Sequence, residues 1–261
     1  MSDTKPLSGK TAVVTGAGRG IGRTIALAFA RAGADMAIAA RTEADLAKLA
    51  DEIRAEGVAC HIVVADVTDA AATEAACSDL VAALGKVDVL VNNAGADLAY
   101  GIDVADSDPE IWWRTIEVNI RGVYLVTRYL LDHINEGGKI INMSSGMGLT
   151  PAPAQSSYVV SKAGLHIFTE CLANEVWKRG IDVNNLIPGP VATEMFNWKG
   201  RERSHSTEEV LDKFKDGLPP MFPPQERMKH PDEVADLALY MATRPVGGPT
   251  GQTFSLARRP L

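Results

Sequence analysis

Tyr158 and Lys162 stand four residues apart in a stretch of helical composition, so their side chains are expected to share one helical face. A phenol can protonate an oxygen on which negative charge develops, and an ammonium group beside it favours the phenolate form. Ser145 lies thirteen residues before Tyr158, and its hydroxyl can donate to the same oxygen. The three side chains could therefore serve the transfer of a hydride and a proton to a ketone. Because Ser144 adjoins Ser145, which serine donates stays open, and a packed tyrosine beside a solvated lysine is the alternative for an isolated pair.

A glycine-rich segment follows the first apolar run of the chain and opens a helix. It carries Gly16, Gly18, Arg19, Gly20, Ile21 and Gly22. Its spacing departs from the G-x-G-x-x-G pattern because residue 21 is isoleucine. These glycines still permit positive φ and a close approach of pyrophosphate to the backbone, and a helix N-terminus attracts anions. We therefore predict a dinucleotide phosphate site, with a plain glycine-rich turn as the alternative.

The elements that position these groups alternate between short β-branched runs and Ala-rich helical stretches. We expect strands at Thr11–Thr15, Asp35–Ala40, Ala59–Ala65, Val87–Val91, Lys139–Met143, Ile181–Leu186 and Gln252–Leu256. We expect helices at Gly20–Arg31, Glu43–Glu56, Asp69–Leu84, Pro109–Asn135, Ser157–Arg179, Thr207–Asp216 and Pro231–Thr243, with Gly180 ending the fifth. The alternation predicts an α/β fold, a doubly wound Rossmann-type sheet of seven parallel strands with helices on both faces. Residues 1–261 show no linker and are expected to form a single dinucleotide-binding and catalytic domain.

The long irregular stretch at residues 188–224 is the expected substrate lid, since loops of this length commonly cover a ligand. It carries Met195, Phe196, Trp198, Met221 and Phe222, together with Lys199, Arg201 and Arg203. An apolar substrate, or one bearing a phosphate or sulfonate, would suit this composition. Lid packing of the aromatic residues and solvation of the charged ones are the simpler explanation.

Composition and charge exclude several kinds of protein. Apolar residues make up 46% of the chain, enough for a large core, and a net charge of −7 without a basic block argues against nucleic acid as a partner. Residues 1–10 lack an apolar run, and the charge-free stretch at 140–161 contains prolines and serines, so we expect no signal peptide, no membrane span and a cytoplasmic location. Cys60, Cys77 and Cys171 are odd in number and widely spaced, which favours reduced thiols in packed positions over disulfides or a metal site.

The ordered set of motifs resembles the short-chain dehydrogenase/reductase family, in its single-domain branch. The motifs are Thr15-Gly16 with Gly20-x-Gly22, Asp66-Val67, Asn92-Asn93-Ala94-Gly95, Asn119, Ser145, Tyr158-x-x-x-Lys162, and Pro188-Gly189 with Thr193. Within the family, the chain most resembles the 3-oxoacyl-carrier-protein reductases and their sugar and polyol dehydrogenase relatives.

The resemblance implies a role for each motif residue. Asn119, Ser145, Tyr158 and Lys162 would be catalytic, with Lys162 tuning Tyr158 and bonding the nicotinamide ribose, and Asn119 holding a water chain to that lysine. The cofactor would contact Gly16, Gly18, Arg19, Gly20, Ile21, Gly22, Arg41, Asp66, Val67, Asn93, Ala94, Gly95, Tyr158, Lys162, Pro188, Gly189, Val191 and Thr193. Asp66 would meet the adenine edge and the 188–193 turn the nicotinamide amide. Met147 and Gln155, close in sequence to Ser145 and Tyr158, are the expected substrate-pocket walls.

The end of the second expected strand indicates the cofactor. Members that use NAD usually carry an acidic residue where Ala40 stands, because a carboxylate holds the ribose 2′-hydroxyl and repels a 2′-phosphate. Arg41 follows directly, and Arg19 lies in the glycine-rich segment, so two guanidinium groups could bind that phosphate. We predict NADP, with NAD possible if both arginines are merely solvated.

The implied function is an NADP(H)-dependent interconversion of a ketone and a secondary alcohol, 3-oxoacyl-reductase-like, on a small-molecule carbonyl or alcohol substrate and in a homotetramer. An NAD-dependent sugar or polyol dehydrogenase is one alternative, which Ala40-Arg41 disfavours. A non-catalytic dinucleotide-binding sensor or scaffold is another, but such a chain should have lost Tyr158, Lys162 or Ser145.

The C-terminus departs from the family pattern. After the last expected strand, the family commonly continues into an acidic residue and paired glycines, whereas this chain reads Ala257-Arg258-Arg259-Pro260-Leu261. Arginine and proline do not adopt positive φ readily, so the tail must leave the sheet by another path. We expect it to contribute to subunit assembly, with a frayed terminus as the alternative.

Overall fold

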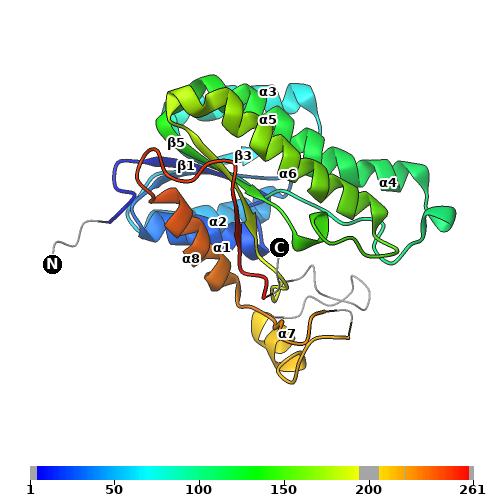
Figure 1. Cartoon of the computed structure of the whole chain (residues 1–261). Coiled ribbons are helices and arrows are strands. Elements are labelled where there is room, and N and C mark those ends of the chain that lie inside the picture. The colour runs from blue at the N-terminus through cyan, green and yellow to red at the C-terminus, as the bar shows by residue number, and fades with distance from the viewer. Residues whose placement is uncertain (1–4, 194–205, 221, 259–261) are drawn as a thin grey trace.

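The computed structural model describes residues 5–193, 206–220 and 222–258, and its centre is one parallel sheet (Figure 1). The strands are β1 (Thr11–Thr15), β2 (Asp35–Ala40), β3 (Cys60–Val64), β4 (Val87–Asn92), β5 (Ile134–Met143), β6 (Asp182–Ile187) and β7 (Thr253–Ser255). Their order is β3-β2-β1-β4-β5-β6-β7, and every pairing is parallel. The prediction of a doubly wound sheet of seven parallel strands is confirmed.

Helices cover both faces of the sheet (Figure 1). They are α1 (Gly20–Arg31), α2 (Glu43–Ala55), α3 (Ala70–Leu84), α4 (Pro109–Ile116), α5 (Gly122–Leu130), α6 (Ser156–Val176), α7 (Thr207–Lys213) and α8 (Pro231–Ala242). Side chains of α1, α2 and α8 build one buried cluster with the sheet, and those of α3, α5 and α6 build another on the opposite face. Burial on both faces explains why the central strands are apolar in sequence without alternation.

The segment expected as one helix at Pro109–Asn135 is helical without a break from Pro109 to His133, with a π turn inside it, and ends two residues early. The segment consists of α4, a π turn at Glu117–Arg121, α5 and a 3-10 turn at Leu131–His133. Strand β5 already begins at Ile134, because Ile134 pairs with Val87 of β4. Local helical composition therefore yields to pairing with a distant strand. Gly180 ends the α6 region as expected, in the left-handed conformation at φ 64°.

Apart from the start of β5, the other expected boundaries shift by at most three residues, a shift reached at the ends of α6 and α7. Helix α7 begins with a capping box between Ser206 and Glu209 and ends at Lys213, three residues before the expected end. Met195, Phe196, Trp198, Lys199, Arg201, Arg203, Met221 and the tail residues Arg259, Pro260 and Leu261 lie outside the described residues. Within the described ranges no helix is both long and apolar enough to cross a membrane.

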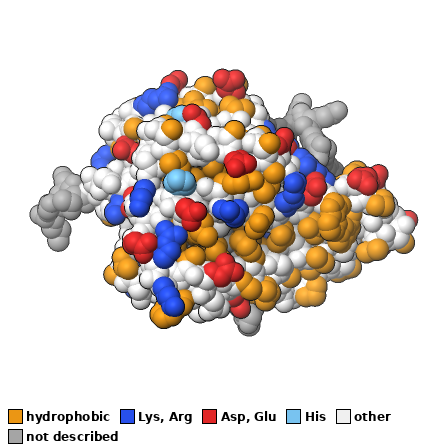
Figure 2. All heavy atoms as spheres, turned by 90° about the horizontal axis from the view of Figure 1, so that it is seen from above, with side chains coloured by type: hydrophobic (Ala, Val, Ile, Leu, Met, Phe, Trp, Pro, Cys, Tyr) orange, Lys and Arg blue, Asp and Glu red, His pale blue; other side chains and the backbone are white. Residues whose placement is uncertain are grey.

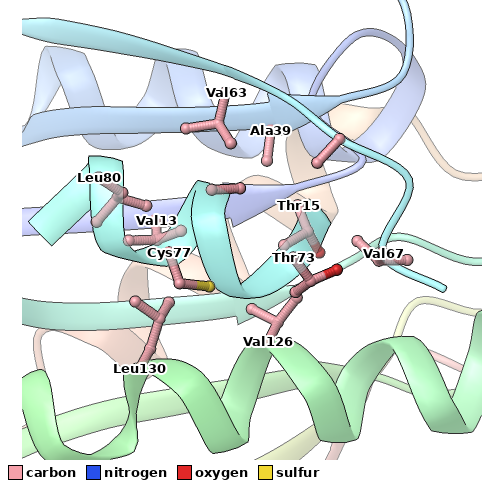
Figure 3. Close-up of a pocket in the computed structure, with 12 residues that line it drawn as sticks. Val13, Thr15, Ala39, Val63, Val67, Thr73, Cys77, Leu80, Val126 and Leu130 are labelled. Atoms are coloured by element: carbon pink, nitrogen blue, oxygen red, sulfur yellow. The ribbon is translucent and has the colours of Figure 1, made fainter. Parts of the chain in front are cut away.

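The cysteines are free thiols, as expected, but they are not all packed. Cys60 and Cys77 are buried, whereas Cys171 lies on the exposed face of α6, which corrects that expectation. Cys77 lines a small apolar void of about 30 Å³ beneath α3 (Figure 3). Burial raises the pKa of this thiol to about 12, so it stays protonated and inert. With apolar walls and room for little more than a water molecule, the void is a packing defect and not a ligand site.

Candidate active site

The candidate site lies where the sheet order reverses, between β1 and β4. These two strands are neighbours, yet the chain leaves β1 towards β2 on one side and reaches β5 from β4 on the other. Ligands of open α/β sheets bind in the crevice at such a point, outside the carboxyl ends of the strands. The glycine-rich segment follows β1, the Asn-Asn-Ala-Gly segment follows β4, and Ser145 follows β5.

The glycine-rich segment is pressed against the segment that follows β4. A Cβ atom on Gly16, whose φ is 64°, would lie 2.9 Å from Ala94 Cα, and one on Gly22 would lie 2.4 Å from Asn93 Nδ2. Asn93 Nδ2 donates to the carbonyls of Thr15 at 3.0 Å and Gly16 at 3.2 Å. Only glycine therefore permits this close backbone approach.

The N-terminus of α1 opens directly from this segment. Its N-cap, Arg19, makes no side-chain capping bond, and the first turn from Gly20 carries no acidic residue. Uncapped N–H groups at a helix N-terminus attract an anion. A backbone cradle closed to side chains, together with this helix end, fits the pyrophosphate of a dinucleotide. Thr193 faces the cradle from the turn after β6, 3.5 Å from the Cβ position of Gly20.

Tyr158, Ser145 and Lys162 come together beside this cradle. Tyr158 lies in the first turn of α6, and its hydroxyl is hydrogen-bonded to that of Ser145. Lys162 Nζ is 5.6 Å from the centroid of the Tyr158 ring and donates to the carbonyl of Met143 at 2.8 Å. The backbone N–H of Met147 donates to Ser145 Oγ at 3.2 Å, which holds the serine in place and brings Met147 to the site.

Burial controls the protonation of the Tyr158–Lys162 pair. It raises the pKa of Tyr158 to about 12, with the Asp97 charge adding to the effect and the Ser145 hydrogen bond opposing it. Burial also lowers the pKa of Lys162 to about 8. The expected lowering of the tyrosine pKa by Lys162 is therefore outweighed, because both groups lose hydration and each charged form is disfavoured. Tyr158 is held as a protonated acid.

Asn119 clamps the segment after β4 to helix α6. Its Oδ1 accepts from the N–H of Ala96 at 2.8 Å, and its Nδ2 donates to the carbonyl of Ala96 at 2.8 Å and to Ser161 Oγ at 2.9 Å. The residue lies in the π turn Glu117–Arg121, a local widening that often marks functional positions. These contacts make Asn119 an architectural link between the two walls of the site.

The two adjacent serines point to different places. Ser144 is buried, and its Oγ lies 3.0 Å from Nε2 of His166 on α6. The same imidazole nitrogen lies 3.3 Å from the carbonyl oxygen of Ser145. Ser145 is half-buried and reaches Tyr158. The geometry thus places Ser145 beside the tyrosine and Ser144 beneath it.

An unforeseen polar ladder crosses the carboxyl ends of β4, β5 and β6. Asn92 Nδ2 donates to Asn142 Oδ1 at 2.9 Å, and Asn142 Nδ2 donates to Thr169 Oγ1 at 2.9 Å. Thr169 in turn donates to Asn185 Oδ1 at 2.9 Å. The three asparagines occupy the same register position. The sequence could have indicated this ladder, because each of the three apolar runs has an asparagine near its end and buried amides need hydrogen-bond partners.

The side of the crevice at the ends of β2 and β3, where we expect adenosine, carries Arg41, Asp66 and Val67. Asp66 accepts from Thr68 N–H at 3.0 Å and from Arg114 at 2.8 Å. Although burial raises its pKa, these hydrogen bonds and the charges of Arg114 and Arg41 outweigh burial and lower it. Asp66 is therefore ionised and fixed.

Asp45, on the first turn of α2, is a residue that sequence reasoning missed. A Cβ on Gly18 would lie 3.4 Å from Asp45 Cβ and 3.5 Å from Ala40 Cβ, so Asp45 stands near the end of β2, which the exposed Arg41 follows in sequence. The sequence signal that could have identified Asp45 is an acidic residue in the first turn of the helix that follows β2. The end of β2 thus carries opposing charges.

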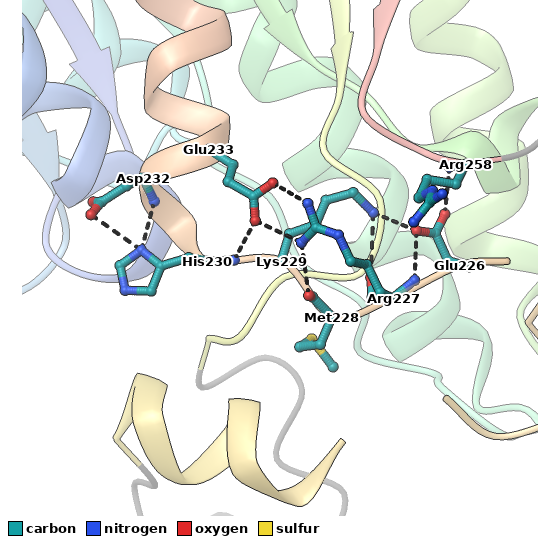
Figure 4. A network of polar contacts seen from close by, with 8 residues as sticks. All are labelled: Glu226, Arg227, Met228, Lys229, His230, Asp232, Glu233 and Arg258. Atoms are coloured by element: carbon teal, nitrogen blue, oxygen red, sulfur yellow. Dashed lines mark hydrogen bonds and ion pairs between the residues drawn. The ribbon is translucent and has the colours of Figure 1, made fainter. Parts of the chain in front are cut away.

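The 188–193 turn rests on a buried ion pair (Figure 4). Lys229 Nζ lies 2.5 Å from Glu226 Oε1, both side chains are 2% exposed, and the lysine nitrogen is 2.8 Å from the Cβ position of Gly189. The carbonyls of Pro190 and Lys229 accept from Lys229 and Ala192 N–H groups at 3.0 and 2.9 Å. Val191 forms an isolated bridge with Lys229. This pair, which sequence reasoning missed, supports the turn expected to meet the nicotinamide.

The C-terminal tail leaves the sheet across this same pair. The N–H of Arg258 donates to Glu226 Oε2 at 2.8 Å. The tail is thus anchored by its backbone up to residue 258, within its own subunit, as far as the structure describes it.

Gln155 and Asp97 complete the described surroundings of Tyr158. Gln155 is the N-cap of α6 and 6% exposed. Asp97, two residues after the Asn-Asn-Ala-Gly segment, carries a charge that acts on Tyr158. The sequence offered no sign of its burial. Among the described residues no group of three or more potential metal ligands forms.

Comparison with known proteins agrees with this geometry. A family model described as short chain dehydrogenase matches residues 10–204. Oxidoreductase UcpA of Escherichia coli (strain K12) is 37% identical over 242 residues, which cover 91% of this chain and 89% of that protein. Versicolorin reductase 1 of Aspergillus parasiticus is 34% identical over 245 residues, 93% of each chain. The structure of a short chain dehydrogenase from Burkholderia cenocepacia J2315 in complex with NADP superposes with a TM-score of 0.82 at 30% identity, covering 97% of this chain and 98% of that one. The chain belongs to the short-chain dehydrogenase family.

Proposed function

We propose that this protein is an NADP(H)-dependent oxidoreductase that interconverts a ketone and a secondary alcohol, with Tyr158 as the general acid and base. The observation that carries the proposal is the buried cluster in which Tyr158 is hydrogen-bonded to Ser145 and lies 5.6 Å from Lys162 Nζ. A protonated phenol with a second hydroxyl beside it suits an oxygen that becomes negative.

Each member of the cluster has a separate task. Ser145 donates to the substrate oxygen and orients it, and Tyr158 delivers its proton as charge develops there. Lys162 places its ammonium group beside the resulting phenolate, and Asn119 holds α6 against the segment after β4. A bound reduced nicotinamide supplies the hydride and, once oxidised, a positive charge that favours the phenolate.

The dinucleotide would be held by the cradle and by the segments around it. Its phosphates would contact the glycine-rich segment at Gly16, Gly18, Arg19, Gly20, Ile21 and Gly22. Its adenosine would contact Arg41, Asp66 and Val67. Its nicotinamide half would contact Asn93, Ala94, Gly95, Pro188, Gly189, Val191 and Thr193. The NADP complex of the Burkholderia relative supports NADP(H) over NAD(H). Arg41 favours a 2′-phosphate, and Asp45 moderates that preference.

The test is a panel of ketones assayed with NADPH and with NADH in parallel. The absorbance of the reduced nicotinamide measures turnover. Turnover with NADPH supports the proposal. Faster turnover of sugars or polyols with NAD would favour the polyol dehydrogenase alternative, and tight NADPH binding without turnover of any ketone or alcohol would favour the sensor. An acetoacetyl thioester belongs in the panel, because the resemblance to 3-oxoacyl-carrier-protein reductases predicts its reduction.

We further propose a homotetramer that works in the cytoplasm. Figure 2 shows hydrophobic side chains gathered over the face formed by α4, α5 and α6. Trp113, Tyr124, Val160 and Ile167 on these helices are about half exposed or more, and apolar side chains exposed together mark protein–protein interaction sites. Light scattering at two protein concentrations tests the assembly. The segment at 188–224 remains our proposed lid, within one catalytic domain spanning 1–261.

A further inference from the structure

Two buried acceptor atoms beside Tyr158 stand out because they lack hydrogen-bond partners in the described part of the chain. They are Asp97 Oδ1 and Gln155 Oε1, and each exposes almost no surface to solvent. Gln155 as a whole is 6% exposed. Buried polar atoms are nearly always paired, since an unpaired acceptor loses its hydration without compensation. Two such atoms on adjoining segments call for a ligand group that donates to them.

Backbone hydrogen bonds bring these two segments together. The N–H groups of Gly101 and Ile102 donate to the carbonyl of Ala154 at 2.8 and 3.1 Å. Ala154 has φ 57°, a left-handed conformation that is strained for a residue with a side chain. This turn sets Gln155 at the start of α6, three residues before Tyr158. The strain is concentrated where the two segments meet.

Both side chains are also fixed by hydrogen bonds to other parts of the protein. The N–H of Ala99 donates to the Asp97 carboxylate, and the backbone of Ala96 is clamped by Asn119. Burial and the Asp97 charge raise the pKa of Tyr100, and a hydrogen bond from the Gln155 side chain opposes that rise, as donation from the amide does. The amide oxygen therefore remains for another partner. Each side chain uses one end for the protein and keeps an acceptor at the other.

We infer that Asp97 and Gln155 form a polar subsite that takes a hydroxyl group next to the reacting carbon, so that the substrates are hydroxylated ketones and, in the reverse direction, vicinal diols. A hydroxyl group can donate its one hydrogen to either acceptor, whereas a methyl group in the same place would leave both of them unpaired. This inference rests on the proposed function and narrows its substrate class.

The test compares ketones that differ by hydroxyl against methyl: 2-hydroxycyclohexanone with 2-methylcyclohexanone, and hydroxyacetone with 2-butanone. We expect kcat/KM to favour the hydroxyl member by about 30-fold or more, because sites built for a hydroxyl discriminate strongly against analogues without it. Asp97→Leu should reduce that preference to a few-fold. Asp97→Asn should keep a preference for the hydroxyl member, since Ala99 N–H holds the amide oxygen and the NH₂ group turned towards the subsite can donate to the substrate hydroxyl.

Asp103→Asn is the matched control, because this carboxylate lies exposed on the same segment. The control should keep the wild-type preference, and NADPH binding by fluorescence should be unchanged in all variants. Equal rates with both members, a preference for the methyl ketones, no turnover of either hydroxyl ketone by protein that binds NADPH, or a preference that survives undiminished in Asp97→Leu would overturn the inference. Failure to bind NADPH would instead refute the proposed function.

Discussion

Replacing Lys229 by methionine removes one half of the buried pair beneath the 188–193 turn (Figure 4). Both side chains are 2% exposed, and Glu226 is left with the backbone N–H groups of Arg227 and Arg258 as its donors, at 3.0 and 2.8 Å. Breaking a buried pair in this way leaves an uncompensated charge and typically costs about 3–5 kcal/mol. We therefore expect Lys229→Met and Glu226→Gln each to lower the free energy of unfolding by about that amount.

The assay is a double-mutant cycle in urea, read by tryptophan fluorescence and by circular dichroism. In Lys229→Met/Glu226→Gln neither charge remains, so the loss should shrink to about 1–2 kcal/mol, and the coupling energy should be about 3 kcal/mol or more. Lys215→Met is the control, since Lys215 and its partner Asp212 are both largely exposed, and such pairs contribute under about 1 kcal/mol. Single variants that cost no more than this control, or losses that simply add, would refute the reasoning.

The pair also predicts a pH dependence whose sign can be worked out. Burial raises the pKa of Glu226, but hydrogen bonds from Lys229, Arg227 and Arg258 outweigh it, so the pKa lies below the ordinary value of 4.5. A carboxyl with a lowered folded-state pKa stabilises above its unfolded pKa, and that stability is lost as the pH falls through the folded value. The difference in unfolding free energy between wild type and Glu226→Gln should therefore be constant above about pH 5 and narrow below it.

The remaining predictions concern the site. Tyr158→Phe should lower kcat by about 100-fold or more, the scale of general-acid catalysis, while NADPH fluorescence titration shows unchanged binding; normal turnover would contradict the role of Tyr158. Arg41→Ala should raise KM for NADPH and leave that for NADH nearly unchanged, and Asp45→Ala should shift selectivity the opposite way; equal effects on both cofactors would argue against contact with the 2′-phosphate. Burial raises the pKa of Asp97 to about 6, so ionising it in the folded protein is penalised as the pH rises from about 4 to 7. The free energy of unfolding of Asp97→Asn should therefore rise by about 1–2 kcal/mol relative to that of wild type across this pH range, after allowance for partial solvent screening. If the unfolding free energies of the two proteins change in parallel with pH, this effect of burial is excluded.

Local pattern determined most of the fold. Fully buried parallel strands must be apolar, and the helices between them must carry one apolar face, so the alternation was visible without contacts. Strands β1 and β2 and helix α1 have the expected bounds. The glycines of the cradle were also readable, because close backbone approach excludes every side chain at Gly16 and Gly22.

Tertiary structure decided what the alternation alone left open. The start of β5 at Ile134 depends on its pairing with Val87, which lies 47 residues earlier in the chain, so no local sequence pattern marks it. The choice between the two serines depends on His166, which receives Ser144 and leaves Ser145 to Tyr158. Such choices are made by side chains far apart in sequence.

Burial, above all, could not be read from residue types. Lys229, Glu226, Asp97 and Gln155 are polar residues in loops or at a helix start, where solvent exposure is the ordinary expectation. Only packing of the chain shows that Lys229 and Glu226 neutralise each other, and that Asp97 Oδ1 and Gln155 Oε1 are buried without partners in the described residues. The proposed hydride and proton transfer thus follows from residue types in the motifs, whereas the proposed polar subsite follows from which polar groups the fold removes from water.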